Sequence, residues 1–316
     1  MQAACVPVAA ELLPAPPAWR LLERAADGPP VIQSALLRVR PYELRAADLS
    51  RYARLVGRVA GSGDVETAAA ATGLLASWSP WYPEAVPLLL ARTVDLDNRS
   101  SWRAAADGLV ELTASAGGSE PLLEALAQLV AAEAEAPALH LDAESERDRP
   151  ARQRIDHLVG RLSTAVTMRQ VEASRTAAVR ASELLCATTD FVPQGTHLAV
   201  TALGLDEKPA VVLASLDRLA ALHTDRPALA ARTAETLRSR LNTARRPGDP
   251  LVLLIAVQRL IANADHAGGI LAVALTHALG SRTRWPQDWR AQLRALRRHP
   301  HPDVRDAALA LRTAAE

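Results

Sequence analysis

The sequence from His299 to Leu311 reads HPHPDVRDAALAL, and it decides the fold. Pro302 stands where a helix can begin, because the first helical turn makes no use of the N–H that proline lacks. The run that follows predicts a helix over residues 302–314. Such a helix cannot bury its apolar side chains alone, so it implies helices of the same kind earlier in the chain.

The composition favours helices throughout. Apolar residues make up 49% of the 316 residues, whereas aromatic residues make up only 3%. Ala and Leu, both strong helix formers, therefore have to fill the core, and no run alternates apolar and polar residues as a strand would. We predict an all-α fold, in which a chain of this length forms two compact domains or one elongated array.

Proline and aspartate mark the starts of many helices. Pro250 follows Asp249 directly, and Pro227 follows Asp225-Arg226, so a capping carboxylate precedes a proline of the first turn. Other prolines also stand before runs with helical periodicity. These signals predict helices over 17–27, 31–39, 47–60, 65–77, 83–94, 99–114, 120–135, 150–166, 168–187, 194–204, 209–222, 226–242, 250–263, 267–280, 286–298 and 302–314.

Two of these helices are unusually apolar. Nearly every residue of 250–263 before Gln258 is apolar, and 267–280 is similar. A helix that is apolar on most sides is expected to be buried on most sides. We therefore expect the two to form an antiparallel pair deep in the core.

An internal repeat supports this organisation. The segment Ala69–Leu74 (AAATGL) matches Ala104–Leu109 (AAADGL), 35 positions later. In the next predicted helix, Pro87–Ala91 (PLLLA) matches Pro121–Ala125 (PLLEA), 34 positions later. Two consecutive helices that recur at nearly one offset define a helix–turn–helix unit of about 35 residues.

The first helix of this unit resembles a known family. Pro-Asp-Val-Arg-x-Ala-Ala at 302–308, followed by Leu309, is similar to the first helix of HEAT repeats, which are related to armadillo repeats. The resemblance covers 300–311 and, with a weaker pattern, 64–130. It implies an α-solenoid, a right-handed superhelix of seven or eight stacked antiparallel helical hairpins. It also implies that three arginines pair with acidic groups of adjacent repeats: Arg103, Arg180 and Arg305.

These patterns divide the chain into four parts. Residues 1–16 contain three prolines and are expected to be irregular, and residues 17–136 are expected to form N-terminal helical repeats. Residues 137–149 are polar and lack an apolar stripe, so they predict a linker or loop. Residues 150–316 complete the C-terminal repeats. The last predicted helix would leave apolar side chains uncovered, so we expect the natural chain to continue or another molecule to dock there.

The net charge, the cysteines and the N-terminal sequence indicate where in the cell the protein is expected to be. The net charge of +1 gives no overall attraction to nucleic acid or anionic membranes. Cys5 and Cys186 lie far apart and do not suggest a disulfide framework. The first 13 residues do not resemble a signal peptide, and no apolar run approaches the roughly 18–20 residues that span a bilayer. We expect a cytoplasmic protein without membrane contact.

No catalytic or metal-binding motif is recognisable. His299 and His301 lack further ligands nearby in the sequence, and Asp95-Leu96-Asp97-Asn98 lacks the glycine and the terminal glutamate of a calcium loop. Gly61-Ser62-Gly63 lies between predicted helices and does not follow a strand, so it is a turn and not a phosphate cradle. We expect no enzymatic activity, no cofactor and no metal.

Two features are candidates for interaction. The turn containing Trp78, Trp81 and Tyr82 holds aromatic residues of the kind that anchor interfaces, although it would equally serve as filler between two helices. In the helix over 286–298, four arginines form a basic ridge opposite an apolar stripe, and the ridge is either a phosphate contact or a solvated face. These arginines are Arg290, Arg294, Arg297 and Arg298.

Three functions are consistent with these features. The first is a scaffold that binds a protein partner along the concave surface of the solenoid. The second is a sensor or regulatory arm of a larger signalling NTPase, suggested by the uncovered last helix. The third is nucleic-acid binding, including a HEAT-like base-excision enzyme, through the arginine ridge.

Overall fold

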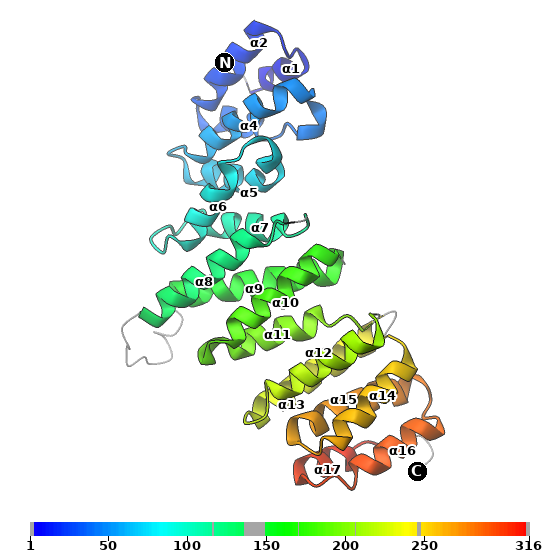
Figure 1. Cartoon of the computed structure of the whole chain (residues 1–316). Helices are drawn as coiled ribbons and strands as arrows, with labels where there is room; N and C mark the ends of the chain where they lie inside the picture. Colours follow the sequence, from blue (N-terminus) through cyan, green and yellow to red (C-terminus); the bar gives the residue numbers. More distant parts are fainter. Residues whose placement is uncertain are drawn as a thin grey trace. The chain divides into compact units, whose positions relative to one another are not determined.

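The structure is a computed structural model, and it describes residues 3–115, 117–135, 149–169, 171–205, 207–244 and 248–313. Within these ranges it consists of seventeen α-helices and three short 3-10 helices, with no β-strand (Figure 1). The predicted all-α fold is therefore confirmed. No helix of these ranges combines the length and the hydropathy needed to cross a bilayer.

The chain divides into two compact units, residues 1–181 and 182–316. The first unit contains α1 (Cys5–Glu11), α2 (Pro16–Ala26), α3 (Pro30–Leu36), η1 (Pro41–Glu43), α4 (Ala46–Ala60), α5 (Val65–Trp78), η2 (Ser79–Trp81), α6 (Ala85–Val94), α7 (Trp102–Leu112), α8 (Glu120–Glu135), α9 (Pro150–Arg169) and most of α10 (Glu172–Cys186). The second contains η4 (Thr189–Phe191), α11 (Val192–Ala202), α12 (Pro209–Ala221), α13 (Pro227–Thr243), α14 (Pro250–Ala262), α15 (His266–Arg282), α16 (Gln287–Leu296) and α17 (Pro302–Leu309).

The division along the chain differs from the predicted one. The predicted linker over 137–149 lies, up to residue 148, outside the described residues. The boundary between the compact units falls after Ala181, inside α10. The N-terminal segment 1–16, expected to be irregular, contains α1. Pro7 is compatible with this helix because it falls in the first turn, and Val6 and Ala9 are buried.

Most predicted helix starts are confirmed. α12, α13, α14 and α17 begin at the prolines that predicted them, and the carboxylate of Asp249 accepts a hydrogen bond from the N–H of Leu251. The last helix is shorter than predicted and ends at Leu309. The side chain of Arg297 donates hydrogen bonds to the carbonyl oxygens of Ala308 and Leu311, which supplies donors that a further helical turn would have provided.

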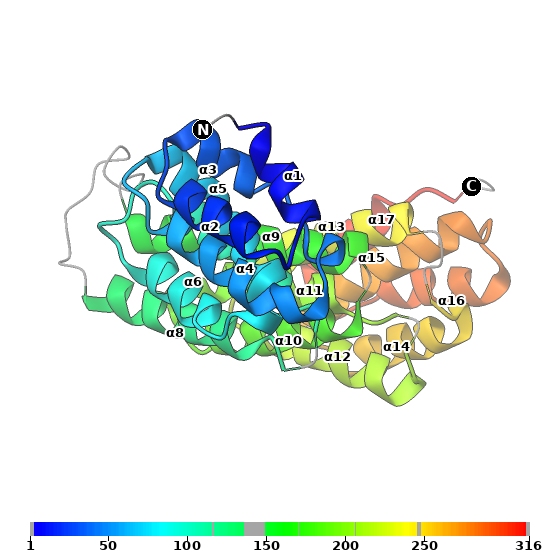
Figure 2. The same ribbon diagram turned by 90° about the horizontal axis from the view of Figure 1, so that it is seen from above.

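Contacts within each unit follow a regular order. In the second unit, α11 contacts α13, α13 contacts α15 and α15 contacts α17, while α12 contacts α14 and α14 contacts α16. Figure 2 shows α12 and α14 along one side of this unit, with α13, α15 and α17 along the other. In the first unit the corresponding pairs are α1 with α3, α2 with α4, α3 with α5, α5 with α7, α6 with α8, and α7 with α9.

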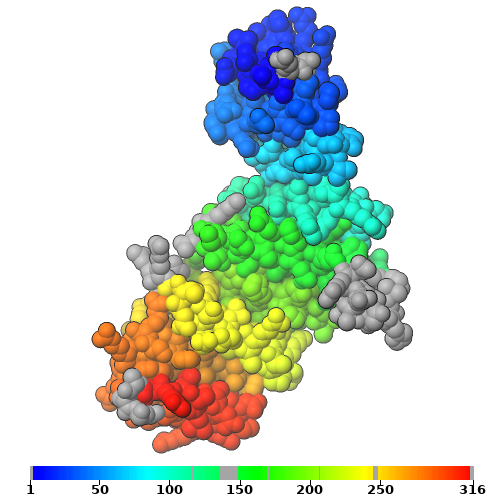
Figure 3. All heavy atoms as spheres, turned by 180° about the vertical axis from the view of Figure 1, so that it is seen from behind, coloured from blue at the N-terminus to red at the C-terminus, as the bar shows by residue number. Residues whose placement is uncertain are grey.

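The core of the second unit centres on α15. Twelve of its residues are buried, and it contacts five other helices: α12, α13, α14, α16 and α17. In the space-filling view of Figure 3 this unit is coloured from green through yellow and orange to red. The predicted burial of 267–280 is therefore confirmed. The predicted burial of 250–263 is wrong in part: α14 packs on α15, but Leu251 and Ile255 point to solvent because one face of α14 stays uncovered.

Arginine side chains of later helices donate hydrogen bonds to backbone carbonyl oxygens at the ends of earlier helices. Arg92 of α6 donates to the carbonyl oxygen of Ala60 at the end of α4, and Arg240 of α13 donates to that of Val200 near the end of α11. Arg282 of α15 donates to the carbonyl oxygens of Leu241 and Ala244 at the end of α13. The last carbonyls of a helix have no partner within it and carry the negative end of its dipole, so a guanidinium group both caps and stabilises them.

Candidate functional site

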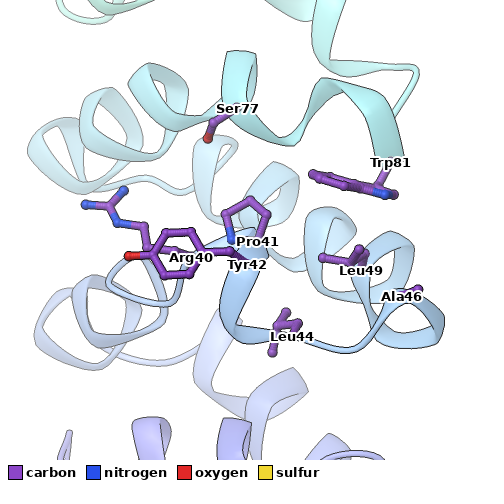
Figure 4. A pocket seen from close by; sticks show the side chains of 8 residues that line it. All are labelled: Arg40, Pro41, Tyr42, Leu44, Ala46, Leu49, Ser77 and Trp81. Carbon is purple, nitrogen blue, oxygen red and sulfur yellow. The ribbon is translucent and has the colours of Figure 1, made fainter.

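A shallow groove of about 590 Å³ lies in the first unit between η1 with the start of α4 on one side and the end of α5 with η2 on the other (Figure 4). We call it the Tyr42–Trp81 groove. Its lining is mostly apolar and contains one charged residue. The residues that line it are Arg40, Pro41, Tyr42, Leu44, Ala46, Leu49, Ser77 and Trp81.

The first wall of the groove is formed by a short, well-defined turn. Pro41 begins η1, and the carboxylate of Glu43 accepts a hydrogen bond of 2.8 Å from the backbone N–H of Arg40. This turn leaves Tyr42 84% exposed, while Leu49 of α4, which also lines the groove, is buried. The aromatic ring is thus held out by the backbone and is not used for packing.

The second wall is held by stacked aromatic rings. Trp78 is buried and stacks on Tyr52, with 5.4 Å between ring centroids. Trp81 meets Trp78 edge to face at 6.2 Å. The hydroxyl of Tyr52 donates to the carbonyl oxygen of Leu36, and burial raises the pKa of this phenol, so the group stays neutral. Trp81 is therefore fixed along one edge while it borders the groove (Figure 4).

The three aromatic residues predicted as one interaction site have different roles. Trp78 is 1% exposed, so its prediction as an interaction residue is wrong: it fills the corner between helices. Tyr82 is half-buried over Gly57, where a Cβ atom would come within 2.6 Å of its ring. Trp81 alone reaches the groove. Sequence reasoning missed the opposite wall, although Pro41-Tyr42 between two helical runs is a local signal for an exposed aromatic residue.

The four arginines of the predicted ridge do not all lie on one exposed surface. Arg290, Arg294 and Arg298 are exposed, and within the described part of the chain none of them takes part in an ion pair. Arg297 does not belong to this surface, because it is half-buried and binds the carbonyl oxygens at the end of α17. The apolar stripe of Trp289, Leu293 and Leu296 is buried as expected.

The three arginines that the HEAT resemblance implied to pair with acidic groups have different partners in the structure. Arg180 forms an ion pair with Glu120 at the start of α8, and its hydrogen bond lowers the pKa of that carboxyl. Arg103 instead lies over the ring of Trp102, with its Cζ 5.2 Å from the centroid. Arg305 donates to the carbonyl oxygens of His299 and Pro300.

Histidines gather where α15 and α17 begin. The ring of His301 lies 5.7 Å from that of His299 and 5.8 Å from that of His266, and Nε2 of His266 is 3.3 Å from Asp303. His299 is 2% exposed, and its Nδ1 accepts a hydrogen bond from the N–H of His301. Burial and the neighbouring His301 lower the pKa of His299. Among the described residues, no three His, Cys, Asp or Glu side chains are placed to hold a metal ion.

The groove offers contact area rather than reactive chemistry. Its eight lining residues include no His, Asp, Glu or Cys, so none of them can act as a general base near neutral pH. The Ser77 hydroxyl donates to the carbonyl oxygen of Leu74 within its own helix. The fold and this site define an all-α protein with an exposed aromatic groove.

Comparisons with known proteins add no family. No protein-family model matches the chain, and no curated protein sequence is significantly similar to it. Among solved structures, the chain is similar to one described as an engineered protein, with 13% sequence identity, 98% of each chain covered and a TM-score of 0.25. A TM-score of this size supports no argument about fold or function.

Proposed function

We propose that the protein is a non-enzymatic protein–protein interaction scaffold built as a HEAT-like α-solenoid. The ordered contacts between helices two places apart support this architecture, because stacked hairpins bring each helix next to its equivalent in the following repeat. The arginine links from α6 to α4, α13 to α11 and α15 to α13 repeat one relationship along the chain.

The observation that carries the binding role is the Tyr42–Trp81 groove. Tyrosine and tryptophan are enriched in interfaces, because they bury large flat surfaces at a low cost in side-chain entropy. Here one such ring is almost fully exposed and a second is half-buried beside it. A lining without acids, histidines or cysteines favours binding over catalysis.

One observation favours a second candidate, nucleic-acid binding. Arg290, Arg294 and Arg298 occur at i, i+4 and i+8 on α16 and lie exposed on one face. Guanidinium groups spaced in this way can contact successive phosphates. The near-zero net charge of the whole chain gives no further support to this candidate.

The two candidates can be separated by affinity capture of partners from the source cells, with and without nuclease. Three proteins are compared: the natural chain, the groove variant Tyr42→Ala/Trp81→Ala, and the ridge variant Arg290→Gln/Arg294→Gln/Arg298→Gln. Nuclease-resistant partners that the ridge variant still captures support the scaffold. Loss of all partners on nuclease treatment and in the ridge variant supports nucleic-acid binding and contradicts the scaffold.

A further inference from the structure

We infer that the Tyr42–Trp81 groove binds an extended, proline-containing segment of a partner protein that carries a carboxylate beside its prolines. This inference rests on the proposed scaffold function and specifies what the scaffold recognises. Its support comes from the shape of the groove, the residues that line it and their charge.

The aromatic residues of the groove suit proline rings. Tyr42 and Trp81 border its two walls, with Pro41 between them (Figure 4). Segments in the polyproline II conformation present flat, apolar rings and dock in grooves lined by aromatic side chains. They are already extended before binding, so little conformational entropy is lost.

The groove is already shaped for a ligand. Trp81 is supported by Trp78, which itself stacks on Tyr52, and the turn at Pro41 is closed by the hydrogen bond between Glu43 and the Arg40 amide. Because Trp81 and this backbone turn are held in place before binding, less free energy is lost in ordering them.

The charge of the groove selects a carboxylate. Arg40 is the one charged residue of the lining, and its side chain is exposed without an ion-pair partner among the residues that the structure describes. The nearby Glu43 carboxylate instead accepts a hydrogen bond from the backbone of Arg40. A guanidinium group binds a carboxylate through two parallel hydrogen bonds, which sets both affinity and direction.

The fluorescence of Trp81 can report on binding in the groove. Five of its six tryptophans are buried, and Trp81 is the exception. Acrylamide quenching of the fluorescence therefore reports mainly on Trp81. Two synthetic peptides with blocked ends serve as ligands. The acidic peptide is Pro-Pro-Leu-Pro-Pro-Glu-Glu, and the basic peptide is Pro-Pro-Leu-Pro-Pro-Lys-Lys. We expect the acidic peptide to protect Trp81 from quenching in a saturable manner and the basic peptide to protect it far less.

Variants test the roles of the residues by calorimetric titration. Tyr42→Ala changes an exposed side chain, so the fold should persist, and we expect the acidic peptide to bind at least about tenfold more weakly. Arg40→Glu should reverse the preference in favour of the basic peptide. Met168→Ala removes another exposed apolar side chain, outside the groove, and should leave binding unchanged.

The outcomes separate this inference from the scaffold function. Absence of protection by either peptide, or an unchanged preference in Arg40→Glu, overturns the inferred ligand. If the groove variant nevertheless loses nuclease-resistant partners, the scaffold function stands with a different ligand. If partners are captured equally by the natural chain and the groove variant, the groove is not the binding site.

Discussion

The Nη1 atom of Arg154 lies 2.7 Å from the carbonyl oxygen of Thr93, although 61 positions of the chain separate the two residues. The same guanidinium group donates to the carbonyl oxygens of Asp95 and Asn98. The Arg154 side chain is buried, and burial lowers its pKa while Asp95 and Asp97 act in the opposite direction. One residue of α9 therefore organises the end of α6 and the loop that leads to α7.

Replacing this arginine should be strongly destabilising. In Arg154→Met the three carbonyl oxygens lose their donor in a buried setting, and each unsatisfied group costs about 1–3 kcal/mol. We expect the free energy of unfolding in urea to fall by roughly 3 kcal/mol. Amide hydrogen exchange over 95–101 should accelerate most.

Arg290→Met is the matched control, because Arg290 is exposed and makes no ion pair in the described structure. Its effect should stay within about 0.5 kcal/mol. Equal stabilities of the two variants would contradict the structural role of Arg154.

Two glycines should respond to alanine in opposite ways. In Gly280→Ala the new Cβ would lie 2.5 Å from the ring of the buried Trp285, so the free energy of unfolding should fall by about 1–3 kcal/mol. In Gly160→Ala nothing lies within 4 Å of the new Cβ, and the position is inside α9. Alanine should there stabilise the helix by about 0.5–1 kcal/mol. Urea denaturation of the two variants checks both signs.

Stability should fall in mild acid because His299 is buried as a neutral ring. Its pKa in the folded protein lies below the ordinary 6.5, first because of burial and then because of His301. The unfolded chain therefore binds more protons than the folded one as the pH falls below 6.5, and the free energy of unfolding decreases there. The contribution of His299 to this pH dependence should level off above about pH 7.5.

The measurement is urea denaturation at about pH 7.5 and about pH 5.5. His299→Gln removes one titrating group and should lose less stability between these pH values than the natural chain. Part of the loss should remain, because burial also lowers the pKa values of His197, His223 and His277. The same loss in both proteins would show that His299 does not contribute.

Nucleic-acid binding gives a separate prediction. If the protein is a scaffold for protein segments, a gel-shift assay with a short DNA duplex at low salt should show no retained complex. If a complex forms through α16, its affinity should fall steeply with salt. Replacing Arg290, Arg294 and Arg298 with Gln should then reduce the slope of log K against log salt by roughly 2.7, because each phosphate that an arginine neutralises contributes about 0.9.

The positions of the helices could be predicted because their signals are local. Pro250 after Asp249 and Pro302 before Asp303 mark first turns, and the Ala- and Leu-rich composition excludes a sheet. The burial of Trp289, Leu293 and Leu296 followed from periodicity along one helix. By contrast, α1 was missed because three prolines suggested an irregular segment, although Pro7 sits in a turn that tolerates it.

The sequence by itself determined that the chain forms helices, where most of them begin and which face of α16 is buried, because capping and periodicity act over a few residues. Only the tertiary structure decided that Trp78 is buried while Trp81 borders a groove, and that Arg297 binds carbonyl oxygens while Arg294 is exposed. It also decided that residues near 42 lie beside residues near 81. These outcomes depend on which helices pack together, and packing joins positions that no local pattern connects.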